Sequence, residues 1–295
     1  MDLDKKLKEK VLLLDGATGS ELQNRGYPTV LPLWSATANL DAPNLVKQIH
    51  ADYIHAGADI ISTNTFRTTQ YAYAKTSKKE EAFISLKSAV KLAKEARKES
   101  GRDVLIAGSL TTLEDCYKPQ NAPDRTTMFK AHKQQIAWLA DQGIDLLLLE
   151  TMNNIAEAVI TAEIASETSL PVFISFITNG QGQLLSGEGL NEAINGVAKY
   201  NPTAILLNCR SLDTIDKDIT ILRSDWDGFI GAYANGYGNA DDDWGWVCDD
   251  EERSLKDFLI IGKKWLADGI NIIGGCCGTT PKHISGLRSL IKNTD

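Results

Sequence analysis

The stretch Ile270-Asn271-Ile272-Ile273-Gly274-Gly275-Cys276-Cys277-Gly278-Thr279-Thr280 decides the architecture, because it holds one complete strand-to-helix connection. Its apolar start has the length of a buried strand, and residues 282–291 follow with helical spacing. Two adjacent cysteines stand between them, bracketed by glycines. Adjacent thiols seldom form a relaxed disulfide, since the bridge needs Cα atoms about 4.4–6.8 Å apart. A shared metal ion is the better interpretation of Cys276 and Cys277, and it requires a further ligand from elsewhere.

The same unit recurs along the chain. Seven more apolar runs, each followed by a segment of helical character, occupy residues 11–14, 60–63, 104–107, 146–149, 172–176, 204–207 and 229–232. Continuous rather than alternating apolar runs are typical of parallel strands covered on both faces. Eight such units predict an α/β protein with a single (β/α)8 TIM barrel, in one domain spanning residues 1–295. The alternative is a doubly wound open sheet, but no G-x-G-x-x-G follows the first run.

Composition narrows the class of function. The 295 residues are 43% hydrophobic and carry a formal net charge of −8. Nucleic acid is therefore excluded as the main partner, because phosphate contacts need clustered Lys and Arg. Residues 1–10 are highly charged, which fits neither a signal nor a transit peptide. No apolar run approaches the ~20 residues that span a bilayer. We expect a cytoplasmic protein with no membrane contact.

Polar side chains collect just past the predicted strands, where barrel enzymes build their active sites. They are Asp15, Thr63, Asn64, Ser109, Glu150, Asn208, Cys209, Tyr233, Cys276 and Cys277. Cys209 supplies the missing ligand, because the carboxyl ends of all strands open on one face. Three thiolates suit Zn²⁺ and leave one coordination position open, as in catalytic zinc sites. The remaining cysteines, Cys116 and Cys248, fall in predicted loops and are interpreted as incidental thiols.

The ligand set also indicates a type of reaction. Zinc with three thiolates has a formal charge of −1, so it activates water poorly but holds a substrate thiolate well. A free thiol has a pKa of about 8.5, and metal coordination removes its proton. The reaction implied is alkyl transfer to a thiol, most simply of a methyl group from a positively charged leaving atom.

These motifs resemble the homocysteine S-methyltransferase family, which includes betaine– and S-methylmethionine–homocysteine methyltransferases and the homocysteine module of cobalamin-dependent methionine synthase. The resemblance rests on Asp15-Gly16-Ala17, Glu150-Thr151, Asn208-Cys209 and Gly274-Gly275-Cys276-Cys277-Gly278-Thr279. It implies that Cys209, Cys276 and Cys277 hold zinc and that homocysteine sulfur takes the fourth position, yielding methionine.

The resemblance also implies a substrate site. In it Asp15 and Glu150 bind the ammonium group of homocysteine, and the backbone N–H groups of Gly16 and Ala17 meet its carboxylate. Asn208 belongs to the same predicted substrate site.

The methyl donor is expected to be a small onium compound such as S-methylmethionine, held against aromatic faces. Candidate aromatic residues are Trp34, Phe66, Tyr117, Tyr233, Trp244 and Trp246, and the acidic run 241–243 directly precedes Trp244 and could add negative potential near a cationic donor. Alternatives stay open. One barrel leaves no room for a corrinoid or folate domain, so a methylcorrinoid donor would arrive on a partner protein. Another thiol or selenol is an alternative acceptor, and a non-catalytic protein with structural zinc or redox thiols is the alternative of another class.

Overall fold

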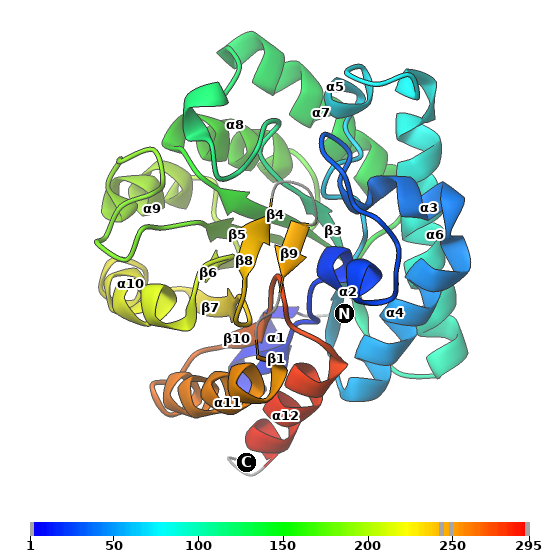
Figure 1. Ribbon diagram of the computed structural model, residues 1–295. Coiled ribbons are helices and arrows are strands. Elements are labelled where there is room, and N and C mark those ends of the chain that lie inside the picture. Colours follow the sequence, from blue (N-terminus) through cyan, green and yellow to red (C-terminus); the bar gives the residue numbers. More distant parts are fainter. Residues whose placement is uncertain (1–2, 242–244, 248–249, 293–295) are drawn as a thin grey trace.

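The computed structural model describes residues 3–241, 245–247 and 250–292, and a barrel of parallel strands forms its centre (Figure 1). The barrel strands are β1 (Leu12–Leu13), β2 (Ile60–Ser62), β3 (Leu105–Leu110), β4 (Leu146–Met152), β5 (Val172–Phe176), β6 (Ala204–Asn208), β7 (Phe229–Ala234) and β10 (Ile272–Gly275). Their order is β1-β10-β7-β6-β5-β4-β3-β2, and a parallel bridge between Leu14 and Ile60 joins the two ends. The predicted (β/α)8 TIM barrel is confirmed.

Helices surround the strands (Figure 1). The longer ones are α2 (Thr18–Asn24), α4 (Pro43–Ala56), α6 (Ala82–Ser100), α7 (Arg125–Asp141), α8 (Ile155–Ser166), α9 (Leu190–Ala198), α10 (Leu212–Asp225), α11 (Glu251–Ala267) and α12 (Pro281–Lys292). Short turns of helix, α3 (Ala38–Asp41) and α5 (Gln70–Tyr73), lie in the loops after β1 and β2. Within the described residues, none of the helices combines the length and apolarity that a membrane crossing requires.

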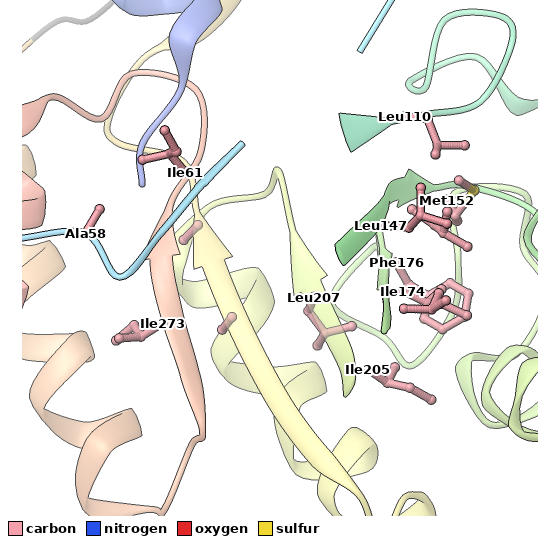
Figure 2. Packing of buried hydrophobic residues seen from close by; sticks show 14 of the residues in the cluster. Ala58, Ile61, Leu110, Leu147, Met152, Ile174, Phe176, Ile205, Leu207 and Ile273 are labelled. Carbon is pink, nitrogen blue, oxygen red and sulfur yellow. The ribbon is translucent and has the colours of Figure 1, made fainter. Parts of the chain in front are cut away.

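Strand side chains fill two apolar layers, because successive residues of a strand point to opposite faces. Figure 2 shows part of the outer layer, including Ile174 and Phe176 of β5 and Ile205 and Leu207 of β6, all fully buried between strands and helices. The intervening residues, such as Phe173, fill the barrel interior. Burial on both faces explains why the strand runs are continuously apolar.

Residues 1–10, described above only as highly charged, include a helix with an apolar face. Residues Leu3–Glu9 form α1, whose Leu3 and Leu7 lie on one helical face and are buried. They pack in the interior cluster that also contains Leu12 and Leu105, at the amino-terminal ends of their strands. The helix therefore closes the barrel at the end opposite the predicted site.

The segment between β7 and α11 contains an antiparallel hairpin, β8 (Asn239–Asp241) and β9 (Gly245–Val247). In Figure 1 the hairpin crosses the view in front of the barrel strands. The backbone N–H of Trp246 donates to Gln23 Oε1 at 3.2 Å, which ties the hairpin to α2. Residues 242–244, which include Trp244, and Cys248 lie outside the described residues.

Candidate active site

Three sulfur atoms meet at the carboxyl end of the barrel. Cys209 follows β6, and Cys276 and Cys277 follow β10 directly. Their Sγ atoms all lie within 4.8 Å of one another. Tetrahedral zinc with Zn–S bonds of about 2.3 Å places its sulfur ligands roughly 3.8 Å apart. The cluster can therefore hold one metal ion after small side-chain adjustments.

The backbone around the sulfurs is held in unusual conformations. Cys209 has φ 60°, a region that costs a non-glycine residue about 1–3 kcal/mol and recurs at functional sites. The N–H of Cys276 donates to the Ala234 carbonyl at 2.8 Å, and its own carbonyl accepts from Thr279 Oγ1 at 2.7 Å. A Cβ at Gly275 would stand 2.2 Å from that Thr279 oxygen, so only glycine fits before the cysteine pair.

The crowded thiols favour a cation. The pKa of Cys209 is raised well above its usual value, chiefly through its hydrogen bond with Cys276 and further by burial. Several thiolates without a counter-ion would repel one another in an enclosed space. A divalent cation reverses this preference, since it binds the thiolate form and displaces the protons.

Two carboxyl groups face the same region. Asp15 is 2% exposed and accepts hydrogen bonds from the N–H and the hydroxyl of Ser62, at 2.8 and 3.0 Å. Glu150 lies within β4 and accepts from the hydroxyls of Ser109 and Tyr233. Burial raises the pKa of Glu150 to about 7 and the pKa of Asp15 well above its usual value. No described Lys, Arg or His pairs with either group, so both lack the cation that would stabilise their charge.

One cavity of about 200 Å³ joins the sulfurs to the carboxyls. Its wall includes, among the predicted site residues, Asp15, Gly16, Ala17, Glu150, Cys209, Cys276 and Cys277. The described hydrogen bonds use neither the N–H of Gly16 nor that of Ala17, the residue that precedes α2. The cavity thus brings together two carboxyls that can bind a cation, two backbone N–H groups without an acceptor among the described residues, and the three sulfur atoms.

Asn208 lies behind this wall and does not line the cavity. It is fully buried, and its Oδ1 accepts from Ser175 Oγ at 2.8 Å and from the Thr151 N–H at 3.2 Å. Its Nδ2 donates to Thr151 Oγ1 at 2.9 Å. These bonds connect the ends of β4 and β6, next to Glu150 and Cys209, so its contacts hold neighbouring site residues in place.

The aromatic candidates gather around the cavity. Trp34, Phe66, Tyr117, Tyr233 and Trp246 all line it, whereas Trp244 lies outside the described residues. The Tyr117 hydroxyl is 3.1 Å from Cys209 Sγ and 3.2 Å from the Cys209 carbonyl oxygen. A ligand beside the sulfurs therefore meets aromatic surface.

Sequence reasoning missed other parts of the wall. Arg67 lies in the loop after β2 and lines the cavity. Barrel topology could have indicated it, because the loops that follow the strands build the active sites of these proteins. Cys116, interpreted as an incidental thiol, is 5% exposed and also lines it. Burial raises the pKa of Cys116 to about 12, which leaves a neutral, weakly nucleophilic thiol outside the three-sulfur cluster.

The fold and the site define a (β/α)8 barrel with a cluster of three thiols that can hold a metal ion and a small-molecule cavity at its carboxyl end. The family model for homocysteine S-methyltransferase matches residues 12–291, and the chain belongs to this family of enzymes. The resemblance found in the motifs is thereby confirmed.

Similar proteins agree with this assignment. A selenocysteine methyltransferase of Astragalus bisulcatus is 28% identical over 96% of this chain and 93% of its own length. Homocysteine S-methyltransferase 2 of Zea mays is 30% identical, covering 96% and 90%. The homocysteine methyltransferase MmuM from Escherichia coli, in its oxidized form, is 26% identical with a TM-score of 0.82, covering 98% of this chain and 99% of that chain. Its metallated form gives a TM-score of 0.80 over 96% of each chain.

Proposed function

We propose that this chain is a single-domain, zinc-dependent enzyme that transfers a methyl group to the thiol of L-homocysteine and forms methionine. The donor is a small onium compound such as S-methylmethionine. The observation that carries the proposal is the presence, in one cavity, of three convergent thiols and two carboxyls without cationic partners.

In this proposal Cys209, Cys276 and Cys277 hold zinc. The metal, when bound, supplies a coordination position at which a substrate thiol is deprotonated at neutral pH. The three residues meet the chemical preference of zinc for thiolate ligands, and all three line the cavity that a substrate would enter. Membership of a family with a metallated solved relative supports a metal here.

The amino-acid end of homocysteine binds on the opposite wall. Its ammonium group carries three N–H donors and fits between the carboxyls of Asp15 and Glu150. Ser62 orients the first carboxyl, and Ser109 and Tyr233 orient the second. The free N–H groups of Gly16 and Ala17 then donate hydrogen bonds to its carboxylate. This arrangement directs the thiol toward the sulfur cluster.

The aromatic part of the wall binds the donor. A sulfonium or ammonium centre over an aromatic face gains about 0.5–2 kcal/mol. In the transfer, the bond from carbon to the donor's onium sulfur breaks and its electron pair stays on that sulfur. A new carbon–sulfur bond forms with homocysteine. The positive charge of the donor's onium centre and the negative charge of the acceptor thiolate neutralise each other in this step. A cavity of low polarity therefore favours the reaction, because it stabilises separate charges less than water does.

One relative supports the alternative that the methyl acceptor is another thiol or selenol. The Astragalus bisulcatus relative is named a selenocysteine methyltransferase, and selenocysteine has the same ammonium and carboxylate groups as homocysteine. We propose it as a second acceptor to be assayed in parallel.

A donor panel tests the proposal. Zinc-loaded protein is mixed with homocysteine and, separately, with S-methylmethionine, betaine or a methylcorrinoid-bearing protein, and methionine is measured. We expect methionine with S-methylmethionine and none with the Cys277→Ala variant. Methionine only with the corrinoid protein would replace the proposed donor by the partner alternative. If none of the donors yields methionine, homocysteine is not the acceptor. If the coordination of zinc does not change when a thiol is added, the protein is a non-catalytic one.

A further inference from the structure

Arg67 is a buried cation on the cavity wall. It is 6% exposed and lines the cavity beside Phe66, with its guanidinium carbon 5.5 Å from the ring centroid of that residue. Its Nη1 donates to the carbonyl oxygens of Thr112, Leu113 and Glu114, at 3.5, 3.3 and 2.7 Å. These bonds fix the side chain under the loop that follows β3.

Most of the hydrogen-bonding capacity of this guanidinium is unused. Nε is buried and has no hydrogen-bond partner, and the described hydrogen bonds of Arg67 all come from Nη1. Unpaired buried donors are rare, and a charged one is costly to leave unpaired. An arginine with free donors on a cavity wall is therefore suited to a bound acceptor, and a carboxylate matches its planar fork.

The acidic side chains of the neighbouring loop are engaged elsewhere. Glu114 accepts from Tyr71 and Lys75, and Asp115 accepts from the Tyr117 N–H and lies 3.6 Å from Lys118. The described ion pairs contain no partner for Arg67. Its charge is thus left on the cavity wall without an ion pair, although it helps to lower the pKa of the nearby Glu114 carboxyl, which binds Tyr71 and Lys75.

The positive charge of Arg67 limits which methyl donors can bind in the cavity. The acceptor's ammonium and carboxylate already have partners at Asp15, Glu150, Gly16 and Ala17 in the proposed function. A donor with only a positive charge would be repelled by a guanidinium in the same cavity. A zwitterionic donor relieves this repulsion, because its onium centre can lie over the aromatic faces while its carboxylate meets Arg67.

We propose that Arg67 binds the carboxylate of the methyl donor and so selects donors that carry an anionic group as well as an onium centre. The proposal deepens the proposed function and rests on it. Arg67 acts in it as a specificity-determining residue, and its bonds to the loop carbonyls keep the guanidinium in position.

The test uses two ligands that differ only in the carboxylate, S-methylmethionine and its carboxamide. Calorimetric titration of the zinc-loaded protein measures both dissociation constants in the native protein, in Arg67→Gln and in Arg67→Lys. Hydrogen bonds between charged groups predict that Arg67→Gln weakens binding of S-methylmethionine about 10–100-fold and of the carboxamide less than about threefold. Arg67→Lys keeps the charge but not the fork, so it retains part of the preference.

The control is Arg97→Gln. Arg97 also donates to a backbone carbonyl, that of Val104, and pairs with Asp145, but it does not line the cavity. It should leave both dissociation constants unchanged. Equal weakening of the two ligands by Arg67→Gln would show that Arg67 only supports the loop. An increase in the KM for homocysteine instead would place Arg67 in the acceptor site.

Methionine formation is measured on the same preparations to separate the two proposals. If methionine forms but the carboxylate makes no difference to binding, the inference on Arg67 is wrong and the proposed function stands. If no methionine forms but Arg67→Gln removes discrimination between the ligands, the proposed function is wrong, and Arg67 is shown to bind the carboxylate of an onium ligand that is not a methyl donor to homocysteine. Failure of the native protein to bind either ligand overturns the inference.

Discussion

The pKa of Glu150 predicts how binding of the amino-acid substrate depends on pH. Burial raises this pKa to about 7, and the ammonium of the substrate requires the ionised carboxylate. At pH 8 roughly ten in eleven molecules carry the carboxylate, and at pH 6 about one in eleven does. The apparent dissociation constant should therefore rise about tenfold between pH 8 and pH 6.

L-Methionine is the ligand of choice for this measurement. It has the ammonium and carboxylate of homocysteine, but its thioether releases no proton at a metal, so only the head group contributes to the pH dependence. Calorimetric titration of the zinc-loaded protein at pH 6, 7 and 8 gives the dissociation constants. The Glu150→Gln variant should bind about 10–100-fold more weakly at pH 8. Its affinity should change less with pH than that of the native chain, because only Asp15, whose pKa burial also raises, still titrates at the ammonium site.

The pH dependence of folding stability is a second measure of the raised pKa of Glu150. The pKa of Glu150 in the folded, ligand-free chain lies above its ordinary value of 4.5. Below pH 4.5 the carboxyl of Glu150 is protonated in both the folded and the unfolded chain, and the free energy of unfolding is then highest. As the pH rises from 4.5 to about 7, the unfolded chain ionises first, and the free energy of unfolding falls by at most about 3 kcal/mol. Urea unfolding should show a larger loss of stability in the native chain than in Glu150→Gln, in which Asp15 still contributes a loss of the same sign. Glu167→Gln, at an exposed position, is the control. A dissociation constant independent of pH in the native chain, or a pH dependence as steep in Glu150→Gln as in the native chain, would refute the reasoning.

Two further pairs of substitutions test the three-sulfur cluster and helix α1, which closes the barrel. Cys277→Ala should abolish zinc binding, measured by metal analysis, and leave the circular dichroism spectrum unchanged, because the sulfurs lie beyond the apolar core. Cys116→Ser should keep the metal, and loss of metal from that variant would count against a three-sulfur cluster. Leu7→Ala should lower the free energy of unfolding by about 2–5 kcal/mol, because it opens a cavity under the barrel. The exposed Lys8→Ala should change it by less than about 0.5 kcal/mol, and equal effects of the two would remove α1 from the folding core.

The barrel could be predicted from sequence because its signal is local. Each strand is buried on both faces, so its apolar run is continuous, and the order of strands and helices then fixes the topology. The convergence of Cys209 with Cys276 and Cys277 follows from that topology, since the carboxyl ends of parallel strands open on one face.

The features that sequence did not reveal depend on distant contacts. Only two leucines of α1 contact the barrel, and their partners lie far along the chain. Asn208 points away from the cavity because hydrogen bonds to Ser175 and Thr151 hold it there. The burial of Arg67 depends on backbone carbonyls from the next loop, which leave no pattern in side-chain composition.

Zinc K-edge absorption spectroscopy tests the central claim most directly, by counting the sulfur atoms bound to the metal before and after homocysteine is added. Three sulfurs from Cys209, Cys276 and Cys277 should become four, at about 2.3 Å. A spectrum that does not change on adding homocysteine, or a metal bound mainly by nitrogen and oxygen, would contradict it.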